Sequence, residues 1–169
     1  AFGGGAVSGA ILAYWKRNPS FAVLGPASGY ICCTALFDLV MPWQAFLVAL
    51  PGPLLLYSGF ELVKKLGLDE PKTAPLTILP ATYSIIMTGV VGNGRPAGGV
   101  MGISSGAYAH LHTHISIGQQ LLGLAVMVPI IAGLALSAIL LIEKTFGLRG
   151  TPERELEGLD SYWTTPSQP

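Results

Sequence analysis

Charge is scarce in this sequence. Only 11% of the 169 residues are charged, whereas an ordinary soluble domain carries about 25%, and the mean hydropathy is +0.58. Lys and Arg number 9, as do Asp and Glu, so the chain lacks the basic excess of a nucleic-acid-binding protein. So few charges cannot cover the surface of a soluble domain, and the composition predicts an integral membrane protein that contacts the lipid bilayer.

Cysteine is also rare, and catalytic motifs are missing. The 2 cysteines are adjacent, Cys32 and Cys33, a spacing that forms neither a disulfide framework nor a metal site. We expect both to be small buried hydrophobic residues. The sequence has no Ser-His-Asp arrangement, no paired carboxylates and no nucleotide-binding fingerprint. We therefore predict that the protein is not an enzyme.

Long apolar runs are what the sequence has in abundance. A helix needs about 20 apolar residues to cross a bilayer, and 51% of the chain is AVILMFWYC. We predict an all-α, polytopic membrane bundle of about five transmembrane helices in residues 1–146, followed by a tail of residues 147–169. The expected spans are about 1–15, 20–37, 42–63, 74–91 and 114–142.

The basic residues fall on one side of this arrangement. Of the 9 Lys and Arg residues, all but Arg95 lie in the first loop, in the third loop or after the last span. The positive-inside rule then places the C-terminal tail in the cytoplasm and the N terminus outside. No span carries Asp, Glu, Lys or Arg near its middle, which disfavours a pump driven by a membrane-buried carboxylate.

Small residues are dense in the first two spans. They include Gly3, Gly4, Gly5, Gly9, Gly25 and Gly29. Because small residues let helices approach closely in membranes, we expect this face to contact a helix of another subunit. We also expect Pro51-Gly52-Pro53 to kink the third span, since each proline removes a backbone N–H donor.

Several motifs resemble one known family. Gln120 to Gly123 read QLLG, Lys144 to Arg149 read KTFGLR, and Glu155 to Asp160 read ELEGLD. These segments resemble the last helix and the cytoplasmic tail of the ammonium transporters. Further resemblances to loops and helix starts of that family lie at Asn18-Pro19-Ser20, Pro42 to Ala45 and Lys64 to Glu70.

The resemblance implies a fold of eleven helices in which two inverted halves build the pore. This chain would correspond to the last five helices and the tail, so one pore histidine and the outer recognition site would lie outside it. A true transporter of this family would form a homotrimer. The residues of the cytoplasmic tail motif would be Gly147, Leu148, Arg149, Glu155, Glu157, Gly158, Leu159 and Asp160.

The family's second pore histidine is expected on the fourth span of this chain. Aligned from Gly67 to Glu70, Ile78 stands where the resemblance places that histidine. In the family, paired imidazoles are thought to hydrogen-bond the permeant and pass its proton, and an isoleucine can do neither. We therefore predict that this chain has lost conduction.

A histidine cluster precedes the last span. His110, His112 and His114 point the same way if the segment is extended. They could form an outer polar cap of the helix, ligate a tetrapyrrole pigment as histidine ligates haem, or bind Zn or Cu. The sequence leaves these three interpretations open.

The tail is expected to pack on the cytoplasmic surface. Its acidic residues can pair with basic residues on the same side, and Leu156 and Leu159 can serve as apolar anchors. The acidic residues are Glu153, Glu155, Glu157 and Asp160, and the basic ones are Lys64, Lys65, Lys72 and Arg149. Exposed ion pairs contribute only about 0–1 kcal/mol each, so the two leucines are needed.

Two functions follow. The first is an ammonium-transporter-like protein that serves as a structural or accessory subunit of a larger membrane complex, photosynthetic or respiratory, and associates with other membrane subunits. The alternative is a half or fragment of a functional ammonium channel.

Overall fold

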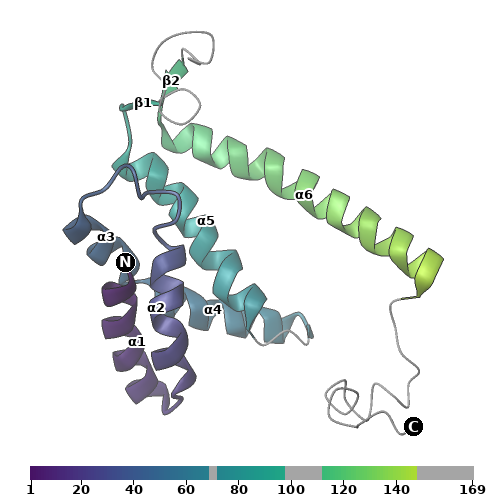
Figure 1. Ribbon diagram of the computed structural model, residues 1–169, viewed down its shortest axis with the longest axis horizontal. Coiled ribbons are helices and arrows are strands. Elements are labelled where there is room, and N and C mark those ends of the chain that lie inside the picture. Colours follow the sequence, from purple (N-terminus) through teal and green to yellow (C-terminus); the bar gives the residue numbers. More distant parts are fainter. Residues whose placement is uncertain (69–71, 98–111, 148–169) are drawn as a thin grey trace, which may run out of the picture. The chain divides into compact units, whose positions relative to one another are not determined.

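The computed structural model describes residues 1–68, 72–97 and 112–147 (Figure 1). The described chain is almost entirely helical, which confirms the predicted class. Its elements are α1 Phe2–Lys16, α2 Ser20–Ile31, α3 Pro42–Ala49, α4 Gly52–Lys65, α5 Thr73–Val91, the short antiparallel strands β1 Pro96–Ala97 and β2 His112–His114, and α6 Ile117–Phe146. The chain divides into two compact units, 1–124 and 125–169, and the packing described below lies within the first.

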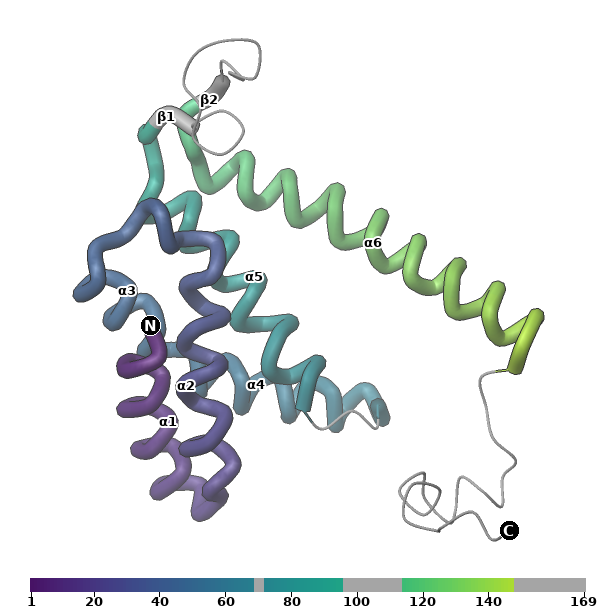
Figure 2. Tube along the Cα trace, in the orientation of Figure 1, coloured from purple at the N-terminus to yellow at the C-terminus, as the bar shows by residue number. Residues whose placement is uncertain are grey.

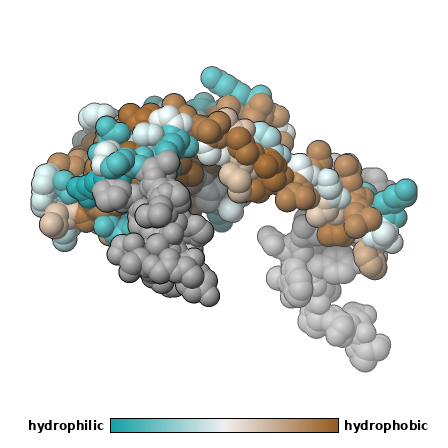
Figure 3. Space-filling view, turned by 90° about the horizontal axis from the view of Figure 1, so that it is seen from above, coloured by the Kyte–Doolittle hydropathy of each residue, from teal (hydrophilic) through white to brown (hydrophobic). Residues whose placement is uncertain are grey.

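Three stretches of the described residues are long and apolar enough to cross a membrane. They are Pro42–Lys65, which joins α3 and α4, Thr73–Val91 and Ile117–Phe146. Exposed side chains line α6, and Figure 3 shows hydrophobic residues over much of the visible surface. An apolar surface of this extent requires contact with lipid or with other apolar protein, so the protein is an integral membrane protein.

The first helix has the predicted length, whereas the second is shorter than its predicted span. α1 has 15 residues and α2 has 12, fewer than the roughly 20 of a full span. The expected span 20–37 ends early, at Ile31, and tight turns follow. In these turns the Cys33 N–H donates to the Tyr30 carbonyl at 2.9 Å, and the Leu36 N–H donates to the Cys33 carbonyl at 2.9 Å.

Hydrogen bonds from a distant helix explain why α2 stops there. The buried Ser84 Oγ on α5 accepts the Ala35 N–H at 3.0 Å, and Thr88 Oγ1 donates to the Ala35 carbonyl at 3.1 Å. Beyond α5, Arg95 Nη1 donates to the Leu39 carbonyl at 2.7 Å. The turn segment, residues 32–40, thus finds hydrogen-bond partners for its backbone on α5 and just after it. The hydrophobic periodicity of the sequence cannot reveal partners so far away along the chain.

Glycines allow α1 and α2 to lie side by side, joined by a short turn (Figure 2). A Cβ added at Gly9 would lie 2.9 Å from Gly25 Cα, and one added at Gly29 would lie 2.7 Å from Gly5 Cα. Each helix contributes two glycines four residues apart, the spacing that permits close backbone contact in membranes.

The prediction that these glycines face another subunit is therefore wrong for all of them except Gly3, which is exposed. Gly5, Gly9, Gly25 and Gly29 are buried in the contact between α1 and α2, and Gly4 is buried against Ala49 of α3. A Cβ on Gly3 would meet the Phe46 ring at 3.7 Å. The close approach that the small residues permit is used inside the chain.

The predicted kink in the third span is confirmed. α3 ends at Ala49 and α4 begins at Gly52, with Pro51 between them. The start of α3 is fixed by Pro42 in its first turn and by Gln44 Oε1, which accepts the Met41 N–H at 2.8 Å. Gly52 packs against α2, since its Cβ would lie 2.7 Å from the Gly29 nitrogen.

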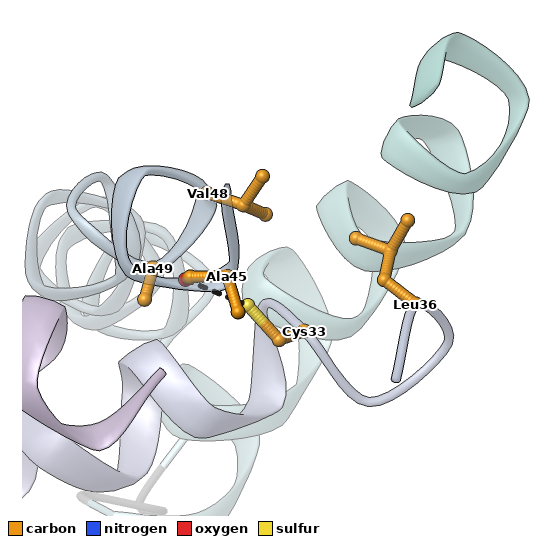
Figure 4. Packing of buried hydrophobic residues seen from close by; sticks show 5 residues of the cluster. All are labelled: Cys33, Leu36, Ala45, Val48 and Ala49. Atoms are coloured by element: carbon orange, nitrogen blue, oxygen red, sulfur yellow. Dashed lines mark hydrogen bonds between the residues drawn. The ribbon is translucent and has the colours of Figure 1, made fainter. Parts of the chain in front are cut away.

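A small apolar core joins the turn segment to α3 (Figure 4). Cys33 and Leu36 are fully buried beside Ala45, Val48 and Ala49. The Cys33 thiol donates to the Ala45 carbonyl at 3.3 Å. Both cysteines have an exposed fraction of 0%, which confirms that they are small buried residues.

Candidate functional site

α5 is the helix that carries Ile78, the residue at which the resemblance expects the family's pore histidine. One face of α5 packs within the first unit and buries Pro75, Pro80, Ser84 and Gly89. It crosses α4 closely, since a Cβ on Gly59 would lie 2.7 Å from the Pro75 carbonyl oxygen. Ile78 is not on this buried face, and its exposed fraction is 49%. The structure therefore leaves the Ile78 side chain available to a permeant, a lipid or another helix.

The other side chains of α5 offer no group that exchanges protons with a permeant at neutral pH. Thr77 Oγ1 donates to the Thr73 carbonyl at 2.7 Å, and Thr82 Oγ1 donates to the Ile78 carbonyl at 2.7 Å. These hydroxyl protons are thus held by the helix's own backbone. The sequence of α5 contains no His, Asp, Glu, Lys or Arg. This helix offers apolar contact and hydroxyl oxygens but no side chain that takes up a proton at neutral pH.

The histidine cluster is only partly described. His112 and His114 both lie in β2, which pairs with β1, and His114 is an exposed residue opposite Pro96. His110 lies outside the described residues. Among the residues that the structure describes, no three His, Cys, Asp or Glu residues come together as metal ligands. The polar-cap, pigment and metal interpretations remain predictions.

The tail motif begins where α6 ends. Gly147 has a positive φ of 70°, a conformation that glycine adopts without a steric penalty, and its N–H donates to the Glu143 carbonyl at 3.0 Å. The other motif residues, Leu148, Arg149, Glu155, Glu157, Gly158, Leu159 and Asp160, lie outside the described residues. Docking of the tail on the protein surface remains a prediction, as does the division of the chain at residue 146.

The first and third loops meet at one end of the first unit. Lys16 and Asn18 from the first loop line the same cavity as Glu61 and Lys72, which flank the third. The predicted topology, in which successive spans alternate in direction, requires the first and third loops to lie at the same end. Which side of the membrane this end faces remains a prediction.

The contact of Lys16 with Tyr57 was not predicted from the sequence. The Tyr57 hydroxyl accepts a hydrogen bond from the Lys16 Nζ at 3.1 Å. The two residues lie 41 positions apart, so no local pattern signals their contact.

The helices, their apolar exposed surfaces and the basic loops together define a polytopic helical membrane protein. The chain belongs to the Ammonium Transporter Family, whose model matches residues 1–164. No curated protein and no solved structure matches the chain. A transporter family is not an enzymatic class, which agrees with the lack of a catalytic motif in the sequence.

Proposed function

We propose that this chain is an ammonium-transporter-family membrane protein that does not itself conduct ammonium or ammonia, and that it serves as a structural or accessory subunit of a larger membrane complex. One observation supports this most directly. The half-exposed position on α5 at which the resemblance expects an imidazole is Ile78. An aliphatic side chain neither hydrogen-bonds an ammonium ion nor carries its proton.

The surroundings of Ile78 support the same proposal. Conduction of a cation through an apolar membrane needs groups that replace its hydration shell, because an unpaired charge there is costly. Thr77 and Thr82 direct their hydroxyl protons to backbone carbonyls of α5. α5 also carries buried Pro75 and Pro80, where the resemblance expects phenylalanine and part of a glycine pattern.

A second candidate is a half or fragment of a functional ammonium channel, which is equally compatible with the family match. That match runs through residues 1–164 and includes all of α5. A conducting member would be isolated as a homotrimer, whereas an accessory subunit would be isolated with unrelated membrane proteins.

A photosynthetic or respiratory host, with a tetrapyrrole at His110, His112 or His114, is part of the first proposal. Purification from the native membrane and an absorption spectrum of the isolated assembly test it.

Ion flux distinguishes the two candidates directly. The purified chain, reconstituted in liposomes that contain a pH-sensitive dye, is expected to show no ammonium-driven pH change beyond that of protein-free vesicles. A conducting ammonium transporter reconstituted in the same way is the positive control. Flux clearly above the protein-free level would refute the structural role.

Ile78→His tests the chemical argument in the same liposomes. We expect no gain of flux, because the resemblance places the second pore imidazole, to which the first would pass a proton, on a helix outside this chain. Ile78→Leu, which keeps an aliphatic side chain, is the matched control. A flux that appears with histidine and not with leucine would show that the helices are otherwise arranged as a working pore.

A further inference from the structure

A cavity of about 450 Å³ lies where α1 ends, α2 begins, α4 ends and α5 begins. Lys16, Glu61 and Lys72 line it with charge, and Phe21 and Phe60 line it with apolar rings. Small-molecule sites typically measure about 300–1,000 Å³. The cavity therefore has the size and the mixed lining of a ligand site, and it does not include Ile78.

Lys16 is held in place at this cavity before any ligand arrives. Its Nζ donates to the Tyr57 hydroxyl at 3.1 Å and lies 4.2 Å from the centroid of the Tyr57 ring. The Phe21 ring fixes this tyrosine in turn, with ring centroids 5.9 Å apart in an edge-on arrangement. A flexible lysine loses much rotamer freedom on binding, and an ordered one loses less.

The charges of the cavity favour an anionic group beside a hydrogen-bond donor. Among the described residues that line it, Lys16 and Lys72 are basic and Glu61 is acidic. Ammonium groups bind phosphate as point charges. The Glu61 carboxylate can accept hydrogen bonds from an ammonium or hydroxyl group attached to that phosphate. A phosphodiester with such a substituent is the headgroup of a membrane phospholipid.

The position of the cavity in the chain fits the same ligand. One membrane-crossing stretch ends at Lys65 and the next begins at Thr73, and Glu61 and Lys72 flank this junction. Residues at the ends of adjacent spans lie at the depth of lipid headgroups, where Lys and Tyr are favoured. An apolar side of the cavity, formed by Phe21 and Phe60, suits the glycerol and upper acyl region of a lipid.

We propose that this cavity binds the headgroup of a phospholipid, with Lys16 and Lys72 directed at the phosphodiester and Glu61 at the headgroup donor. The site would be occupied whether or not the protein conducts, so it goes beyond the proposed function and its test does not depend on flux.

Native mass spectrometry of the full chain in detergent, titrated with phosphatidylethanolamine, tests the proposal. Lys16→Gln removes the ordered charge, and we expect about fivefold weaker lipid binding, since one basic residue near a membrane surface contributes about that factor. Lys64→Gln is the matched control, because Lys64 is exposed in the last turn of α4 but does not line the cavity. We expect it to change binding by less than about twofold. Equal losses in the two variants would overturn the site in favour of diffuse surface charge.

Two further arms keep the result interpretable. Tyr57→Phe keeps the ring and removes the hydroxyl that orders Lys16, so lipid binding should weaken while the thermal unfolding temperature stays near that of the unmodified chain. Unchanged binding in this variant would contradict the role given to the pre-ordered lysine.

Glycerol 3-phosphate is the soluble probe, and we expect it to bind far more weakly than the lipid. Binding as tight as that of the lipid, lost in Lys16→Gln, would assign the cavity to a free phosphate and overturn the lipid proposal.

Discussion

Replacing Gly29 by alanine is expected to separate α1 from α2 and to destabilise the first unit strongly. The new Cβ would lie 2.7 Å from Gly5 Cα and 2.8 Å from the Gly5 nitrogen. Both are backbone atoms, so no side-chain rotation can relieve the overlap. Overpacking costs about 1–3 kcal/mol, and we expect a loss of about 3 kcal/mol in the free energy of unfolding. Thermal unfolding in detergent, followed by circular dichroism, measures it.

Gly123→Ala is the matched control for this experiment. Gly123 lies on α6, and a Cβ built there meets nothing within 4 Å. The same added methyl group should therefore not destabilise the protein, and the higher helix propensity of alanine should raise the unfolding free energy by up to about 1 kcal/mol. If both variants lost the same stability, the close contact of α1 with α2 would not be what holds the unit together.

The second large effect is expected from Ser84→Ala. Ser84 has an exposed fraction of 0%, and its Oγ accepts the Ala35 N–H. Alanine would leave that part-buried N–H without this partner, and an unsatisfied backbone group costs about 1–3 kcal/mol when it is buried. We expect the lower part of this range, because Ala35 is an exposed residue and its hydrogen bond is only part-buried. Hydrogen exchange of the Ala35 amide should become much faster, and residues 32–40 should become accessible to protease.

Ser58→Ala provides the comparison for the serine change. Ser58 Oγ donates only within its own helix, to the Leu54 carbonyl at 2.9 Å, and the side chain is exposed. This substitution should leave both the stability and the Ala35 exchange rate nearly unchanged. Slow exchange of Ala35 in Ser84→Ala would mean that the turn segment is held by other contacts, such as the hydrogen bond from Arg95 to the Leu39 carbonyl.

Helix packing and lipid contact are what this molecule offers most plainly. Its internal crossings use glycine, its exposed helix surfaces are apolar, and its charges gather in the loops. A subunit that contributes helices to a larger membrane assembly needs these properties. A conducting protein needs them as well, and also needs polar groups along its permeation path, which is why the flux measurement at Ile78 separates the two proposals.

The sequence by itself determined the class of protein and the general course of the chain. Low charge and long apolar runs require a membrane environment. A helix satisfies its own backbone hydrogen bonds there, while its apolar side chains contact lipid. The break at Pro51 was predictable, since proline removes a donor that a helix needs. The family resemblance was also carried by local motifs, which need no knowledge of the fold.

Only the tertiary structure decided how the glycines and the second span are used. Gly5 and Gly29 would look the same in sequence whether they met each other or a foreign helix, because close approach depends on which helices become neighbours. The end of α2 at Ile31 depends on Ser84, and the placement of Lys16 depends on Tyr57. Such contacts join residues more than 40 positions apart, and their free energy exists only once the helices have packed.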